Sequence, residues 1–130
     1  MISIENGRLG ESIAAEFYEA NGYRIICKNY RSGHNEIDII AVKENHIVFA
    51  EVKTRTKTDA LWKYGSAKSA VDRHKQKHLL DAALANLHEE KSAKGQRPRM
   101  DVVEVYLTRD GRFLKLNYIR NAFGIRSNNR

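Results

Sequence analysis

The stretch from Asn35 to Thr54, NEIDIIAVKENHIVFAEVKT, constrains the fold more than any other part of the chain. Apolar and β-branched residues fill both of its arms, a composition that favours strands over a helix. We predict two strands, Glu36 to Lys43 and His46 to Lys53, joined by a turn at Glu44 and Asn45. A two-residue turn fixes the register of an antiparallel pair, so the numbers of facing residues add up to 89.

In this register Asp38 faces Glu51, and Glu36 faces Lys53, near the open end of the hairpin. Side chains alternate between the two faces of a strand, so these charged residues share one face. Closer to the turn that face is apolar and carries Ile40, Val42, Ile47 and Phe49. The opposite face is apolar throughout and is expected to lie in the core, with Ile37, Ile39, Ala41, Val48, Ala50 and Val52.

Two carboxylates that face each other across a strand pair repel, so Asp38 and Glu51 need an explanation. A divalent cation between them would replace the repulsion with binding, because Mg2+ is a hard ion that one or two carboxylates hold together with waters and substrate phosphates. Lys53 would lie beside that cation, where it could orient the attacking water or stabilise charge on a phosphate. The spacing fits a phosphodiester-cleaving centre and, equally well, a strand end on the surface where Glu36 and Lys53 form an ordinary pair.

Charge points to the class of partner. The chain has a net charge of +7 and a pI near 9.6, which favours a polyanion, with nucleic acid ahead of a membrane. We predict one globular domain over residues 1–123 and a basic tail over 124–130. Cys27 is the single cysteine, so an intrachain disulfide is excluded. No segment has the character of a transmembrane helix or a signal peptide, and we expect a cytoplasmic protein.

A helix is predicted from Gly7 to about Asn21, with Asn6 as its N-cap. Its main apolar stripe is expected to be Leu9, Ile13, Phe17 and Ala20. Glu11 lies in a second stripe beside the small residues Ala14 and Ala15 and Tyr18. Such a glutamate could approach a neighbouring element closely, although a first-turn glutamate that the helix dipole favours is the simpler explanation.

A second helix is predicted from residue 69 or 70 to about Lys91. We expect its buried side to carry Leu80, Ala83, Leu84 and Leu87, with Leu79 and Ala82 at the flank. His74 and His78 are spaced as a zinc-ligand pair, but no third ligand is identifiable by spacing, so solvated histidines are the simpler explanation.

Three further strands are predicted: Tyr23 to Tyr30, Met100 to Leu107 and Phe113 to Tyr118. The last two are expected to pair across a turn at Asp110 and Gly111. The order is then helix, three strands, helix, two strands, which indicates an α/β sandwich with a mixed sheet.

The segment after the hairpin is basic and emerges directly from Lys53. Its side chains that could contact DNA phosphates are Arg55, Lys57, Lys63 and Lys68, and the second helix adds Lys75. Trp62 and Tyr64 could stack on exposed bases, or Trp62 could anchor the loop to the core.

These motifs together resemble the PD-(D/E)XK, restriction-endonuclease-like nucleases. More closely, the chain is similar to the YraN-like family of small bacterial proteins related to archaeal Holliday junction resolvases. The matching stretches are GRLGE at 7–11, EIDII at 36–40, FAEVKTR at 49–55, RMDVV at 99–103 and NAF at 121–123. The resemblance implies a restriction-endonuclease-like α-β-β-β-α-β-β sandwich with a mixed central sheet. Two departures are visible: Asn35 stands where the family usually has glycine, and Met100 replaces a usual phenylalanine.

The resemblance also implies roles for single residues. Asp38 and Glu51 would ligate Mg2+ or Mn2+ with help from the Val52 carbonyl, and Lys53 would be the catalytic lysine. Glu11 would be a further residue of the metal site, and Lys75 matches a lysine whose role is less clear. The implied protein is a metal-dependent endonuclease acting on branched or distorted DNA, with a homodimer as the assembly of a resolvase. The alternative is a nucleic-acid-binding adaptor that keeps this fold without cleaving DNA.

Overall fold

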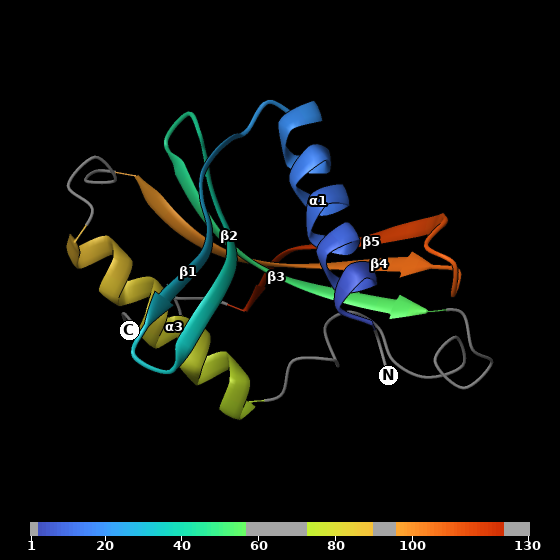
Figure 1. The fold of residues 1–130 in the computed structure, drawn as a ribbon. Coiled ribbons are helices and arrows are strands. Elements are labelled where there is room, and N and C mark those ends of the chain that lie inside the picture. Colours follow the sequence, from blue (N-terminus) through green and yellow to red (C-terminus); the bar gives the residue numbers. More distant parts are fainter. Residues whose placement is uncertain (1–2, 57–72, 90–95, 124–130) are drawn as a thin grey trace.

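The computed structural model describes residues 3–56, 73–89 and 96–123 (Figure 1). Its elements follow the predicted order of helix, three strands, helix, two strands, which confirms the mixed α/β fold. They are α1 (Ile4–Ala20), β1 (Arg24–Ser32), β2 (Asn35–Lys43), β3 (His46–Thr56), α3 (Arg73–Glu89), β4 (Arg97–Leu107) and β5 (Phe113–Phe123). No helix in these residues combines the length and the apolar character that crossing a bilayer requires.

The strands form one sheet in the order β1-β2-β3-β4-β5. All neighbours are antiparallel except β3 and β4, which run parallel and are connected through α3, as a parallel pair requires a crossover. The predicted hairpin register is confirmed from the pair Lys43–His46 to the pair Ile39–Ala50. The predicted pairing of β4 with β5 is confirmed as well.

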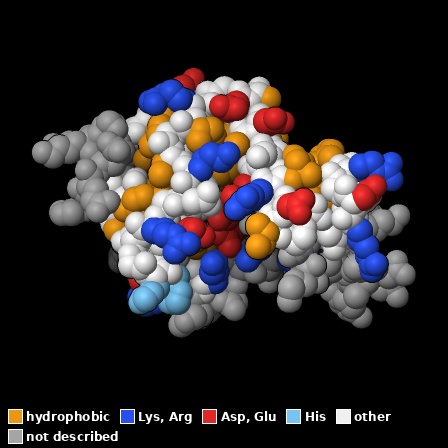
Figure 2. Space-filling model, in the orientation of Figure 1, with side chains coloured by type: hydrophobic (Ala, Val, Ile, Leu, Met, Phe, Trp, Pro, Cys, Tyr) orange, Lys and Arg blue, Asp and Glu red, His pale blue; other side chains and the backbone are white. Residues whose placement is uncertain are grey.

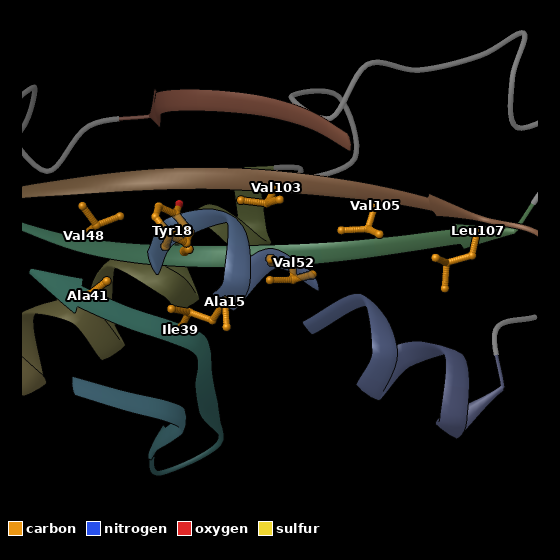
Figure 3. Close-up of a cluster of buried hydrophobic side chains, with 11 residues drawn as sticks. Ala15, Tyr18, Ile39, Ala41, Val48, Val52, Val103, Val105 and Leu107 are labelled. Atoms are coloured by element: carbon orange, nitrogen blue, oxygen red, sulfur yellow. The ribbon is translucent and has the colours of Figure 1, made fainter. Parts of the chain in front are cut away.

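The two helices cover opposite faces of the sheet (Figure 1). On one face, α3 packs on a cluster made of Ile37, Ile40, Ile47, Phe49, Leu79, Ala82, Ala83, Met100, Val102 and Ala122. On the other face, α1 packs on the cluster in Figure 3, which contains Ala14, Ala15, Tyr18, Ile39, Ala41, Val48, Ala50, Val52, Val103, Val105 and Leu107. The sheet is therefore buried on both sides, which explains the long apolar runs in β2, β3 and β4.

The first helix differs from its prediction in its cap and in its buried face. Ser3 is the N-cap and accepts the N–H of Asn6 at 3.1 Å, whereas Asn6 is a buried helical residue that donates its side-chain amide to the Arg109 carbonyl. The buried stripe consists of Gly10, Ala14, Ala15 and Tyr18. The predicted stripe, Leu9, Ile13, Phe17 and Ala20, is half-buried or exposed. The small residues face inward because they let the helix axis approach the sheet closely.

The predicted face of the second helix is wrong at Leu84, which is 50% exposed, while the flanking residues Leu79 and Ala82 are buried. Ala83 is buried as predicted, and Leu80 is half-buried against the same core. The side chain of Leu87 lies outside the described residues. Because alanines at 82 and 83 allow close packing on β2, the helix presents them rather than the larger Leu84 to the sheet.

The alternation of β2 also breaks at one point. Ile37 was predicted to share a face with Ile39, but it packs with Ile40 on the α3 side. The break coincides with an irregularity in β1, where Asn29 has a positive φ of 56° and the pairing between β1 and β2 skips Asn29 and Asp38. A left-handed residue twists a strand locally, so the residues on either side of Asp38 turn toward opposite faces.

Candidate active site

The site lies where β2 and β3 separate. Their backbone pairing ends at Ile39 and Ala50, and β3 then continues beside β4 alone (Figure 1). Beyond this point a side chain replaces the backbone partner: the Val52 N–H donates a hydrogen bond to the Asp38 carboxylate at 2.7 Å. The predicted contact of Asp38 with Glu51 is therefore made by side chains at the point of divergence. Glu36 does not pair with Lys53 and instead forms an ion pair with Arg31, at 3.3 Å between Oε2 and Nε.

Asp38 and Glu51 are both buried, with exposed fractions of 8% and 5%. The pKa of Asp38 is raised to about 8, first by burial and then by the Glu51 carboxylate, which acts through its charge and through a hydrogen bond between the two groups. The Val52 N–H lowers the pKa of Asp38, but less than burial and Glu51 raise it. Burial and the neighbouring Glu51 carboxylate therefore favour the protonated form of Asp38 when no cation is bound.

Two lysines from different elements converge on Glu51. The Nζ of Lys53, on β3, lies 3.2 Å from Glu51 Oε2, and the Nζ of Lys75, on α3, lies 3.7 Å from the same oxygen. Lys53 follows Glu51 by two residues, so alternation puts both side chains on the α3 face of the sheet. The structure thus brings together Asp38, Glu51, Lys53 and Lys75 as predicted site residues.

Glu11 reaches the same region from α1 on the other side of the sheet. It is half-buried, and its pKa is raised by burial first and then by the charges of Glu36 and Glu51. Lys28 and a hydrogen bond from Asn29 lower the pKa of Glu11. Glu11 also contributes to the raised pKa of Asp38. The opening between β2 and β3 lets these carboxylates influence one another from both faces.

Gly10 explains how α1 comes close enough. A Cβ at this position would overlap Thr54 Oγ1 and lie 3.0 Å from Thr54 Cβ and Cγ2, so α1 touches β3 directly at Thr54. Glu11 is the next residue on α1 and is thereby held close to the sheet. The absence of a side chain at position 10 is what brings the helix glutamate to the site.

We expect Gly10→Ala to reduce the free energy of unfolding by about 1–3 kcal/mol, because the new methyl group overlaps Thr54. Ser12→Ala, at an exposed position of the same helix, is the matched control and should change stability by less than about 0.5 kcal/mol. Thermal or urea melts measure both. Adding Thr54→Ala should restore part of the loss; an additive effect of the two substitutions would contradict the contact.

Figure 2 shows acidic side chains gathered near the middle of one face of the molecule, with Lys and Arg side chains around them.

Of the predicted DNA-binding residues, Arg55 and Lys75 lie in the described part of the chain. Lys57, Lys63 and Lys68, and with them Trp62 and Tyr64, lie outside it. The side chain of His74 also lies outside it, and His78 is exposed. Within the described residues, no three His, Cys, Asp or Glu side chains are grouped as a ready-made metal cage.

Sequence reasoning missed two buried carboxylates in β4. Asp101 is completely buried and accepts hydrogen bonds from Tyr18 at 2.8 Å and Tyr118 at 2.6 Å, while Arg99 bonds both of its oxygens at 2.9 and 3.1 Å. This network ties α1 to β4 and β5. Glu104 is also completely buried and pairs with Arg55. The available signal was the presence of two acidic residues inside the otherwise apolar run from Met100 to Leu107, because buried acidic residues require partners.

The model of the uncharacterised protein family UPF0102 matches residues 10–105 of this chain. A UPF0102 protein of Caldanaerobacter subterraneus subsp. tengcongensis is 42% identical over 118 residues, which cover 90% of this chain and 93% of that protein. A UPF0102 protein of Symbiobacterium thermophilum is 45% identical over 118 residues, covering 90% and 94%. One of Clostridium perfringens is 35% identical over 119 residues, covering 92% and 93%. The matched region includes Glu11, Asp38, Glu51 and Lys53.

Proposed function

The chain belongs to the uncharacterised protein family UPF0102, and we propose that it is a Mg2+- or Mn2+-dependent DNA endonuclease. The observation that carries the proposal is the buried pair Asp38 and Glu51 at the open end of the hairpin, with the Lys53 ammonium 3.2 Å from Glu51. Burying two hydrogen-bonded carboxylates is costly for a structural role alone. A buried carboxylate with a raised pKa, such as Asp38, next to a lysine at a strand end is typical of a reactive centre.

The residues present fit a hard divalent cation. Two carboxylates converge, and one of them carries a raised pKa that a bound cation would reverse. The N–H and C=O of one strand residue point toward the same neighbour, so the Val52 carbonyl is directed to the same side as the Val52 N–H that bonds Asp38. Mg2+ and Mn2+ accept this oxygen set and keep several water ligands, so a cage of three or more side chains is not required.

A divalent cation, when bound, would polarise a phosphate oxygen and promote ionisation of a water. In this centre the Asp38 and Glu51 carboxylates would hold the cation, and the proton on Asp38 would pass to solvent when the cation binds. Lys53 donates a hydrogen bond to the phosphate oxygen on which negative charge accumulates. Lys75 offsets the charge of Glu51 and keeps its carboxylate oriented. Glu11, on the opposite side of the opening, accepts a hydrogen bond from a water on that side.

The net charge of +7 supports a polyanionic substrate, because the acidic centre is local while the molecule as a whole is cationic. Nucleic acid supplies both the phosphodiester that such a centre cleaves and the charge that the basic surface attracts. We propose branched or distorted DNA as the preferred form, on the resemblance to junction resolvases.

The proposal is tested by incubating the protein with labelled linear duplex, single-stranded, flapped and four-way DNA, in Mg2+, in Mn2+ and in EDTA. We expect nicking of at least one substrate in either metal and none in EDTA. Denaturing gels detect the products. Binding to DNA without cleavage of any substrate in either metal would contradict the endonuclease and favour an adaptor.

A further inference from the structure

Glu104 is a buried charged residue that the proposed chemistry does not use. It is completely buried in the interior of β4 and is the register partner of Lys53 on the adjacent strand β3. Its Oε2 accepts the Nε–H of Arg55 at 2.6 Å, and its Oε1 accepts from the Tyr106 hydroxyl at 2.9 Å and the Asn117 amide at 3.5 Å. A carboxylate without exposure is therefore fully engaged, which offsets the cost of removing it from water.

The nitrogen through which Arg55 bonds Glu104 determines which of its other N–H groups point elsewhere. Within the described residues, the ion pair of Arg55 with Glu104 uses Nε. A guanidinium has five N–H donors in a rigid plane, so bonding through Nε leaves those on the two terminal nitrogens. The Arg55 side chain is 25% exposed, whereas that of Glu104 is 1% exposed. Glu104 thus engages the Nε edge of the guanidinium, while a quarter of the Arg55 side chain is exposed.

The position of Arg55 relative to the candidate centre suggests that its ligand is a phosphate. Arg55 follows Lys53 by two residues on β3, which puts the two side chains on one face and about 7 Å apart along the strand. Lys115 adds positive charge nearby, because its Nζ lies 4.7 Å from the centre of the Tyr106 ring. The terminal nitrogens of a planar guanidinium match two oxygens of a phosphate.

We propose that Glu104 is a positioning residue that fixes Arg55 as a clamp for a DNA phosphate adjacent to the one attacked at Lys53. This rests on the proposed function, since it takes DNA as the ligand. Fixing Arg55 in advance reduces the side-chain entropy lost on binding, and it sets the direction of the hydrogen bonds. A structural ion pair that only stabilises the sheet is the competing explanation.

The test measures DNA binding in EDTA at several salt concentrations, with a fluorescent four-way junction and a fluorescent duplex as probes. Arg55→Ala is expected to weaken binding about 10-fold and to lower the slope of log affinity against log salt by about 1. Arg55→Lys should weaken binding nearly as much, because its single nitrogen cannot bond Glu104 and a phosphate in the same bidentate way. Arg112→Lys, in the exposed Asp110–Arg112 ion pair, is the matched control and should change affinity less than about 2-fold.

A double-mutant cycle identifies the part played by Glu104. In the Glu104→Gln background the effect of Arg55→Ala should fall below about 3-fold, because Arg55 has already lost its support. Equal effects of Arg55→Ala in both backgrounds would overturn the positioning role. Wild-type affinity of Arg55→Lys would overturn the clamp. If thermal melts show that Glu104→Gln does not fold, the comparison of Arg55→Lys with the wild type alone tests the proposal.

The two proposals can fail separately. Binding in EDTA requires no cleavage, so Arg55-dependent binding without cleavage in any metal would refute the endonuclease and retain the clamp. Cleavage with unchanged affinity in Arg55→Lys would refute the clamp and retain the endonuclease.

Discussion

Replacing Lys53 with alanine is expected to lower the rate of metal-dependent DNA cleavage by about 10²- to 10⁴-fold. The Lys53 ammonium lies 3.2 Å from Glu51 and is the nearest described cation to the carboxylate pair. Its removal takes away a hydrogen bond that strengthens as charge accumulates on the phosphate, so the loss should be in kcat rather than in KM. Single-turnover cleavage of the best substrate from the DNA panel measures it.

The control for this experiment is Lys77→Ala, which removes the same charge from an exposed i,i+4 pair with Asp81 on α3. It should leave cleavage within about 2-fold of the wild type. DNA binding in EDTA should fall only a few-fold in Lys53→Ala, because one positive charge among many is lost. Cleavage by Lys53→Ala at the wild-type rate would remove Lys53 from the mechanism.

Asp38→Asn is expected to stabilise the metal-free protein while abolishing cleavage. At pH 8.5 the gain should be at least about 1 kcal/mol, because the buried carboxylate and its repulsion with Glu51 disappear. The amide oxygen keeps an acceptor for the Val52 N–H, so the hydrogen bond that closes the strand divergence is retained. Thermal melts in EDTA measure the difference, which should be a few degrees in Tm.

The effect depends on pH with a defined sign. The pKa of Asp38 rises from an ordinary value of 3.8 to about 8 on folding, so between these values the folded state keeps a proton that the unfolded state has lost. The wild type should therefore lose stability as pH rises from about 4 to about 8, and the Asp38→Asn variant should lose less over that range. Stability curves of the two proteins should converge toward pH 4; parallel curves would contradict the raised pKa.

The wild type and Asp38→Asn should also differ in how strongly a divalent metal stabilises them. Mn2+ should raise the Tm of the wild type by mass action and the Tm of Asp38→Asn much less, since the variant lacks one anionic ligand. Asp81→Asn, at an exposed acid in the Lys77 pair, is the matched control and should respond to Mn2+ as the wild type does. Equal shifts in all three proteins would show that Asp38 and Glu51 do not share a cation.

Local sequence determined the hairpin and the order of elements. The turn at Glu44 and Asn45 leaves two residues between strongly apolar arms, and this alone fixes which residues face each other up to Ile39 and Ala50. The proximity of Asp38 to Glu51 was predicted from the same register. The position of Lys53 on the same face as Glu51 was predicted from the alternation of side chains along β3. These predictions depend on residues close together in the chain, where few arrangements are sterically allowed.

Only the tertiary structure decided how the site is completed. Asn29 of β1 has a positive φ, and the β1–β2 pairing omits Asp38 next to the residue at which the β2–β3 pairing ends; the hairpin sequence alone predicts neither feature. Glu11 reaches the opening because Gly10 meets Thr54, a contact between residues 44 positions apart. The pairing of Arg55 with Glu104 likewise requires the parallel alignment of β3 and β4. Such contacts depend on which faces pack together and in what register, and periodicity within one segment carries no information about the partner segment.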